Sequence, residues 1–397
     1  RTNELAGQFI FDDQTHFLRD DFPHDAILGL GEFAAEHWNP KLKEEGLSLT
    51  RYKFENYIAE LWYRSDTKMA LLSGAPFDDP SWWLLGNDQI VAARDMINDF
   101  AGTTRMLGHS VITPGQDGWM DEAERAMSEL KPNSWKSYTI GDPLSPSKYP
   151  WRLDDEKLMY PFYEKSLKAG INTICIHKGL LPPDYETSFK GVWKYATVDD
   201  LPKAAKDWPE MNFVIYHSAL RPFLELPDQA WKEFEESGGY IKWASDLARI
   251  PEEHGVSNVY GELGSTFANS AVAHPRFCAA FIGTLVKGLG ADHVVWGTDT
   301  VWYGSPQWQI EAMRRLEVPE DMQKKYKLPS LGGPNSLTKQ AIFGLNSARI
   351  YGLSMNEATN MPDLPNFSED KIAGLAAKFR EAGGGPSNKR FGYTRKA

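Results

Sequence analysis

Residues 171–177 read INTICIH, a short run of apolar and β-branched residues that ends in a histidine. This composition is typical of a strand that is buried on both faces of a sheet. The pattern returns at 212–218, NFVIYHS, where a histidine again follows the apolar run. A segment near the start of the chain ends in His16, and a late one, HVVWGTD, ends in Asp299. Four predicted strands therefore end in a side chain that can bind a metal or move a proton.

Further runs of the same kind bring the number of predicted strands to eight. They lie at 8–16, 67–74, 103–115, 134–140, 171–177, 212–218, 257–264 and 293–299. Helical patterns separate them, most clearly at 87–101, 158–170 and 275–290, the last with proline in its first turn and glycine after its end. Strands that alternate with helices indicate parallel βαβ units, and eight of them predict an α/β protein with a closed (β/α)8 TIM barrel. A doubly wound open sheet fits less well, because no glycine-rich phosphate loop follows the first strand.

The barrel is expected to occupy residues 1–353 as a single domain. Residues 17–64 are rich in aromatic side chains and are interpreted as a helical insertion after strand 1. Residues 354–397 end in glycine, proline, serine and basic residues, which indicates a C-terminal arm or extension.

Composition excludes several classes of function. Of the 397 residues 42% are hydrophobic and 24% charged, so the chain can bury a large core, and its formal net charge is −11. Without a run of lysine and arginine, nucleic acid is not an expected partner, and no apolar run reaches the ~20 residues of a membrane span. The two cysteines, Cys175 and Cys278, cannot build a disulfide framework. A cytoplasmic location is expected, or a periplasmic one if an export signal preceded Arg1.

The positions of the histidines predict an active site. Of the nine histidines, His16, His177 and His217 end predicted strands, and Asp299 ends the eighth. Active sites of TIM barrels lie at the carboxyl ends of the strands, so these four side chains should converge. The other histidines are interpreted as surface or packing residues.

The motifs around these residues resemble the amidohydrolase superfamily. The similarity lies in its amidohydrolase-related (amidohydrolase 2) branch, which includes aminocarboxymuconate semialdehyde decarboxylase and metal-dependent hydrolases. The matching stretches are DDQTH (12–16), CIHKG (175–179), IYHSA (215–219), WGTDT (296–300) and IFGLNSARIYGL (342–353). One position departs from the pattern: the branch commonly has His-x-His on strand 1, and here the first histidine is Gln14. An amide oxygen binds Zn²⁺ less well than imidazole does.

The resemblance implies a mononuclear metal site at the barrel mouth. Its ligands would be His16, His177 and Asp299, with Gln14 in or near the shell, and the ion would be Zn²⁺ or, as an alternative, Mn²⁺. Such an ion lowers the pKa of a bound water. Asp299 would act as general base, and His217 would polarise a carbonyl or protonate a leaving group.

Four more residues are expected to bind the substrate or to support the ligands. Glu262 ends strand 7 and can orient a metal-bound imidazole. Lys178 and Arg221 could meet an anionic group, and Trp302 could line an aromatic pocket for a ring-bearing small molecule.

Three functions remain open from the sequence. The first is a metal-dependent hydrolase that attacks an amide, ester, lactone or C–C bond next to a carbonyl. The second is a metal-dependent, non-oxidative decarboxylase of an aromatic or muconate-like acid. The third is a non-catalytic ligand-binding barrel. A homodimer is expected, because barrels of this branch are often dimers.

Overall fold

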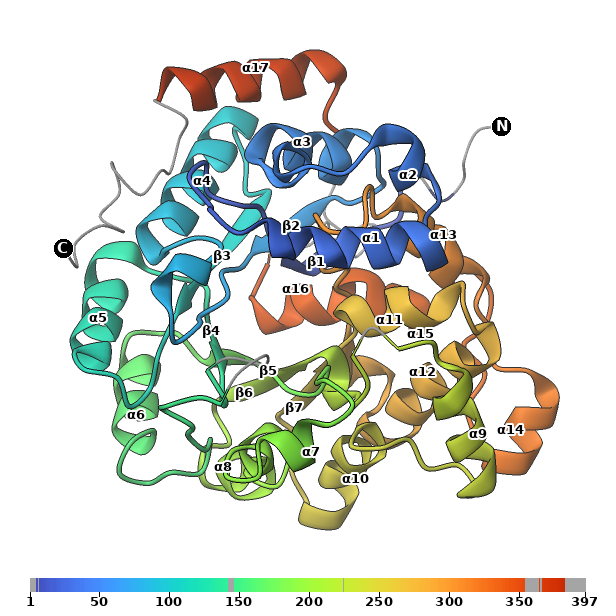
Figure 1. Cartoon of the computed structure of the whole chain (residues 1–397). Helices are drawn as coiled ribbons and strands as arrows, with labels where there is room; N and C mark the ends of the chain where they lie inside the picture. The colour runs from blue at the N-terminus through green and yellow to red at the C-terminus, as the bar shows by residue number, and fades with distance from the viewer. Residues whose placement is uncertain are drawn as a thin grey trace.

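The computed structural model describes residue 5 and residues 7–141, 146–223, 225–353, 364 and 366–382. Its centre is a sheet of eight parallel strands that lie side by side in sequence order (Figure 1). The strands are β1 (Phe11–Thr15), β2 (Met69–Leu72), β3 (Met106–Val111), β4 (Ser134–Tyr138), β5 (Thr173–His177), β6 (Asn212–Tyr216), β7 (Val259–Glu262) and β8 (Val294–Val295). The predicted (β/α)8 barrel is confirmed.

The barrel closes where the segment after β8 runs beside β1. Thr15 and Thr300 form a parallel bridge, and the amide of Asp299 donates to the carbonyl oxygen of Gln14 at 3.0 Å. The eighth strand ends at Val295 and is shorter than the predicted 293–299, and Asp299 has a left-handed φ of 58° that an extended strand does not allow. The first and last strands thus meet at one seam.

Helices surround the barrel, as Figure 1 shows. They are α1 (Leu28–His37), α2 (Lys41–Glu45), α3 (Phe54–Ile58), α4 (Asn87–Ala101), α5 (Trp119–Arg125), α6 (Tyr160–Lys168), α7 (Tyr185–Ser188), α8 (Leu201–Asp207), α9 (Asp228–Glu236), α10 (Ala244–His254), α11 (Gly264–Ala271), α12 (Pro275–Leu289), α13 (Gln307–Arg315), α14 (Glu320–Tyr326), α15 (Leu337–Gln340), α16 (Asn346–Ile350) and α17 (Glu369–Glu381). The helices predicted at 87–101, 158–170 and 275–290 are α4, α6 and α12. Each begins and ends within two residues of the expected positions.

An aromatic pair closes the amino-terminal end of the barrel. Tyr351, which follows α16, stacks on Phe11 at the start of β1, with ring centroids 5.7 Å apart. Its hydroxyl lies 3.4 Å from that of Ser134, the first residue of β4. Side chains therefore fill this end of the barrel, and the opposite end is left for the site.

The segment between β1 and β2 contains α1, α2 and α3, and it packs against the C-terminal part of the chain. Phe54 of α3 stacks on Phe379 of α17, with centroids 4.0 Å apart and planes 7° apart. Figure 1 shows α17 beside α3 and α4. Within the expected arm, 354–363, 365 and 383–397 lie outside the described residues.

Both cysteines are buried free thiols. Among the described residues, no helix combines the length and the apolar character needed to cross a bilayer.

Candidate active site

The polar residues predicted at the strand ends line one cavity of about 250 Å³ at the carboxyl end of the barrel. Gln14 lies in β1 and His16 directly after it, His177 ends β5, and His217 follows β6. Asp299 stands in the segment after β8. The structure therefore brings these side chains to a common cavity floor, hereafter the polar floor.

His16 and Asp299 make direct contact on the polar floor. Nε2 of His16 lies 3.1 Å from Oδ1 of Asp299, and Nδ1 of His16 lies 2.8 Å from the carbonyl oxygen of Ser73. Because a carbonyl oxygen only accepts hydrogen bonds, Nδ1 must carry the proton. A neutral His16 would then turn the lone pair of Nε2 toward a carboxylate oxygen. The side-chain nitrogen of Gln14 lies 3.4 Å from the same Nε2 atom, and a cation beside Nε2 and Oδ1 would make their contact favourable.

Burial and neighbouring groups shift the pKa values of the two carboxyl groups of the site in opposite directions. For Asp299, burial alone would raise the pKa, but the hydrogen bond and charge of His16, the charge of His217 and the hydroxyl of Ser265 together lower it. For Glu262, burial raises the pKa well above its ordinary value. Asp299 is therefore the ionised carboxylate on the polar floor.

His177 and His217 lie edge to face, with ring centroids 4.5 Å apart. His177 also stacks on Tyr138, and its Nε2 atom lies 3.2 Å from the carbonyl oxygen of Gly179. In the described part of the chain, the Nδ1 atoms of both histidines are buried without a hydrogen-bond partner. Burial lowers the pKa of His217 to about 3, so its imidazole is neutral near neutral pH. Both rings retain a nitrogen that can bind a ligand or a proton.

The backbone around the polar floor adopts conformations that side chains disfavour. His217, Ser218 and Ala219 have φ values of 65°, 48° and 56°, and Asp299 has 58°. Each such residue costs on the order of 1–3 kcal/mol and persists only where its surroundings impose it. Strain of this kind gathers at functional sites, and here it aims His217 and Asp299 into the cavity.

Glu262 supports this strained turn from below. Its Oε2 atom accepts the backbone N–H of His217 at 3.0 Å, and its carbonyl oxygen accepts the hydroxyl of Ser218 at 2.8 Å. Its side chain is fully buried. Glu262 thus contacts the backbone of a site residue, as a supporting residue would.

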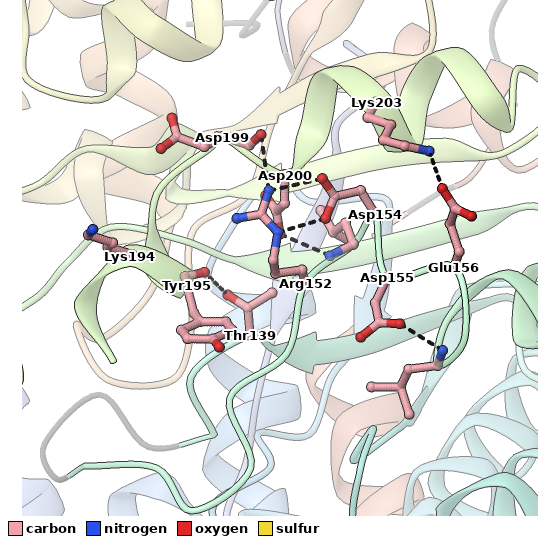
Figure 2. Close-up of polar contacts among 12 residues, drawn as sticks. Thr139, Arg152, Asp154, Asp155, Glu156, Lys194, Tyr195, Asp199, Asp200 and Lys203 are labelled. Carbon is pink, nitrogen blue, oxygen red and sulfur yellow. Dashed lines mark hydrogen bonds and ion pairs between the residues drawn. The ribbon is translucent and has the colours of Figure 1, made fainter. Parts of the chain in front are cut away.

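Lys178 does not reach the cavity. Its ammonium group lies 2.6 Å from the carbonyl oxygen of Thr197, 3.1 Å from that of Tyr195 and 3.0 Å from Oδ1 of Asp200. These acceptors take up its three protons. Figure 2 shows the surrounding network, in which Arg152 binds Asp154 and Thr139 donates to Tyr195.

Arg221 is occupied elsewhere as well. It makes two hydrogen bonds to the carboxylate of Glu186, at 2.8 and 2.5 Å, and donates to the carbonyl oxygens of Leu181 and Pro182. Among the described residues, no lysine or arginine lines the cavity. The expected clamp for an anionic substrate is therefore not formed by these two residues.

The walls of the cavity are apolar and largely aromatic. Trp302 stacks on His16 with centroids 6.0 Å apart, and Trp82 stacks on His24 near the mouth. The other apolar wall residues are Ala26, Ile27, Leu30, Ala75, Phe77, Leu84, Tyr138, Leu180 and Phe223. Polar atoms are thus concentrated on the floor, and apolar surface forms the sides and roof.

Several residues at or below the cavity were not predicted. Ser265 and Tyr303 line its floor, and Ala26, Ile27, Gly29 and Leu30, in and just before α1, line its roof. Lys136 of β4 is buried inside the barrel, with Nζ 3.8 Å from the ring centroid of Tyr216, and burial lowers its pKa to about 8. Of these residues only Lys136 could have been found from the sequence. It lies two residues before Tyr138 in a predicted strand, so the two side chains point to the same face.

The donor set of the polar floor suits a divalent ion in kind. His16, His177 and Asp299 supply nitrogen and oxygen donors, and Oε1 of Gln14 is buried without a partner among the described residues. Across the same residues, no three His, Cys, Asp or Glu side chains are already close enough to enclose an ion. His16 and Asp299 form a ready pair, and His177 would have to move closer to join them.

Comparison with known proteins identifies the family. The family model for amidohydrolases matches residues 63–353. The chain belongs to the amidohydrolase family. This amidohydrolase has no significant match among curated protein sequences.

Solved structures of similar fold share little sequence with this amidohydrolase. An uncharacterised TIM-barrel protein from Bordetella bronchiseptica has a TM-score of 0.51 and 12% identity, over 86% of this chain and 98% of that one. A 2,6-dihydroxybenzoate decarboxylase from Rhizobium has 0.49 and 13%, over 87% and 99%. A dihydroxybenzoic acid decarboxylase from a Polaromonas species, with manganese and 2-nitroresorcinol bound, has 0.48 and 14%, over 88% and 98%. At these identities the likeness concerns the fold.

Proposed function

We propose that this amidohydrolase is a metal-dependent enzyme that removes the carboxyl group of a ring-bearing acid without oxidation. The distribution of polar and apolar residues in the cavity supports this proposal. A polar floor, nearly closed to solvent, lies under apolar and aromatic walls. On the floor, Gln14 and His217 are 2% exposed and His16 is 3% exposed. An aromatic ring would pack on the walls and direct one charged group downward.

His16, Asp299, Gln14 and His177 would hold the divalent ion. The support for an ion is the His16–Asp299 contact, where a ring nitrogen and a carboxylate oxygen lie 3.1 Å apart. When bound, the ion would supply Lewis-acid stabilisation of negative charge on substrate oxygens. Zn²⁺ or Mn²⁺ suits this mixed nitrogen and oxygen donor set.

The charge balance of the floor favours an anionic substrate. Asp299 carries one negative charge, whereas burial lowers the pKa of His217 and raises that of Glu262, which favours the uncharged form of both. With Asp299 as the only charged residue among its proposed ligands, a divalent cation would keep a net positive charge in a largely apolar cavity. A single carboxylate would neutralise it, so that no lysine or arginine clamp is needed.

The residues of the cavity suit loss of CO₂. The C–C bond to the carboxylate breaks, CO₂ leaves, and the electron pair stays on the ring carbon until that carbon takes a proton. Apolar walls weaken the solvation of the carboxylate, which favours a transition state with dispersed charge. The partner-free Nδ1 atom of neutral His217 can take up a solvent proton before the substrate binds and then pass it to the ring carbon.

Hydrolysis of a carbonyl compound is the second candidate. The same Nδ1 atom of neutral His217 could accept a proton from water. The closed floor disfavours this reaction, because each turnover would have to admit a water molecule beneath the bound ring.

Isotope labelling distinguishes the two reactions. Protein loaded with Mn²⁺ is given ortho-hydroxybenzoic acids in D₂O, and aromatic lactones, esters and amides in H₂¹⁸O. We expect CO₂ and a product with one deuterium on the ring carbon, both absent with Asp299→Asn. Incorporation of ¹⁸O into a new carboxylate, with no CO₂ from any acid, would overturn decarboxylation in favour of hydrolysis.

A further inference from the structure

Ser265 links Asp299 to a buried tyrosine. Its hydroxyl contacts Oδ2 of Asp299 on one side and lies 2.5 Å from the hydroxyl of Tyr303 on the other. All three side chains line the floor of the cavity and are buried. Ser265 is the second residue of α11, and Tyr303 lies in the segment that follows Asp299.

The direction of the first hydrogen bond sets that of the second, since Ser265 donates to Oδ2 of Asp299. A carboxylate only accepts, so the single proton of Ser265 must point to Oδ2. Ser265 then has no proton for Tyr303, and the hydroxyl of Tyr303 must donate to Ser265. The Tyr303 hydroxyl therefore donates to Ser265, and the Ser265 hydroxyl donates to Asp299.

The position of Tyr303 is fixed by the segment between β1 and β2. Trp38 packs edge to face on its ring, with centroids 4.9 Å apart, and the side-chain amide of Asn39 donates to its carbonyl oxygen at 3.0 Å. The indole N–H of Trp308 donates to the same carbonyl oxygen at 3.2 Å. Tyr303 is thus held from two sides, and its hydroxyl reaches Ser265 at a defined point.

We propose that Ser265 and Tyr303 are positioning residues that fix which oxygen of Asp299 acts. Ser265 engages Oδ2 and Tyr303 holds Ser265, so that Oδ1 alone faces His16 and the cavity. Asp299 then offers one oxygen to an ion or substrate, and its carboxylate cannot rotate without breaking its hydrogen bond to Ser265. This assignment rests on the proposed function, in which Asp299 binds the divalent ion.

Mn²⁺ binding to the full chain, measured by titration calorimetry, tests the proposal. Loss of a residue that orients a ligand typically weakens metal affinity 10- to 100-fold. We expect a loss of about this size for Ser265→Ala and a smaller one for Tyr303→Phe, because Ser265 can still donate to Asp299. Ser265→Thr keeps the hydroxyl and should restore most of the affinity, which a purely structural role would not require.

Two matched variants serve as controls. Ser270→Ala removes a buried hydroxyl from the same helix, one that bonds to the carbonyl oxygen of Thr266. Tyr52→Phe removes the hydroxyl of a buried tyrosine that packs on Trp302. Both should bind Mn²⁺ as the wild type does. Wild-type affinity in Ser265→Ala, or an equal loss in Ser270→Ala, would overturn the proposal.

Crystal structures of the metal-free variants separate this proposal from the proposed function. If wild-type protein binds no Mn²⁺, the metal-dependent function fails, but the positions of the side chains can still be compared. We expect Asp299 to leave His16 in Ser265→Ala and to keep the contact in Ser270→Ala. An unmoved Asp299 in both Ser265→Ala and Tyr303→Phe would overturn the positioning role. Thermal unfolding shows whether each variant is folded, so that only folded variants are compared.

Discussion

Oδ1 of Asp299 lies 3.1 Å from Nε2 of His16, across the seam where the end of the barrel meets its beginning. The two residues stand at opposite ends of the barrel sequence, and each is held by a further bond: Ser73 binds the other nitrogen of His16, and Ser265 binds the other oxygen of Asp299. The pair is thus oriented before any ligand arrives. Preorganisation of this kind reduces the cost of binding a cation between the two groups.

Asp299→Asn should abolish turnover while the protein stays folded. Asparagine has nearly the same shape and tolerates the left-handed backbone of this position, where φ is 58°. It carries no charge, so the loss of activity should be roughly 10²- to 10⁴-fold. Product release measured beside circular dichroism tests this. Retained activity would remove Asp299 from the chemistry.

Gln14→His should raise the affinity for Zn²⁺, because imidazole is a better ligand for this ion than an amide oxygen. Gln14→Leu has similar size and no donor atom, and it should lower the affinity below that of the wild type. The Zn²⁺ content of the three proteins after purification without chelators gives the order of their affinities. The same content in all three proteins would show that this position does not contact the ion.

Lys178→Met should destabilise the fold and leave substrate binding unchanged. The side chains of Lys178 and Asp200 are 0% and 2% exposed, and removal of one partner leaves a buried charge. Such a loss costs about 3–5 kcal/mol of unfolding free energy. Urea denaturation measures it, and Lys178→Met combined with Asp200→Asn should recover part of the loss. A changed KM with unchanged stability would instead show that Lys178 contacts the substrate.

Glu186→Gln should reduce stability at neutral pH but not in strong acid. Hydrogen bonds from Arg221 are the largest cause that lowers the pKa of Glu186, to about 2, and its side chain is 25% exposed. Because the folded pKa lies below the ordinary value of 4.5, the stabilisation is complete above that pH and fades as the pH falls toward 2. The variant should lose about 2 kcal/mol at pH 7. Unfolding curves from pH 7 to pH 2 should converge, and a constant difference would contradict the role of the charge.

The alternation of predicted strands with helices, and the turn residues that bound each strand, were sufficient to predict the barrel. Each apolar run ended in turn residues, and a barrel strand depends mainly on its own composition and its two neighbours. His16, His177 and His217 could be predicted on the cavity floor for the same reason. The carboxyl ends of all parallel strands lie at the same end of the barrel, so side chains at these ends gather there.

The remaining parts of the cavity depend on packing between distant segments. Ser265 and Tyr303 lie outside the strands, in positions set by α11 and by Trp38, and nothing local in their sequence marks them. Lys178 was expected to meet an anionic group of the substrate. Its partners are Thr197, Tyr195 and Asp200, and the loop that brings them together carries no periodic signal.

The stack of Phe379 on Phe54 has a consequence for the order in which the protein is made. Phe54 belongs to the segment that carries α1, the roof of the cavity, and Arg380 adds an ion pair to Glu55 of the same segment. Helix α17 is the last described helix to leave the ribosome. The roof thus receives this outer support only after every strand of the barrel has been synthesised.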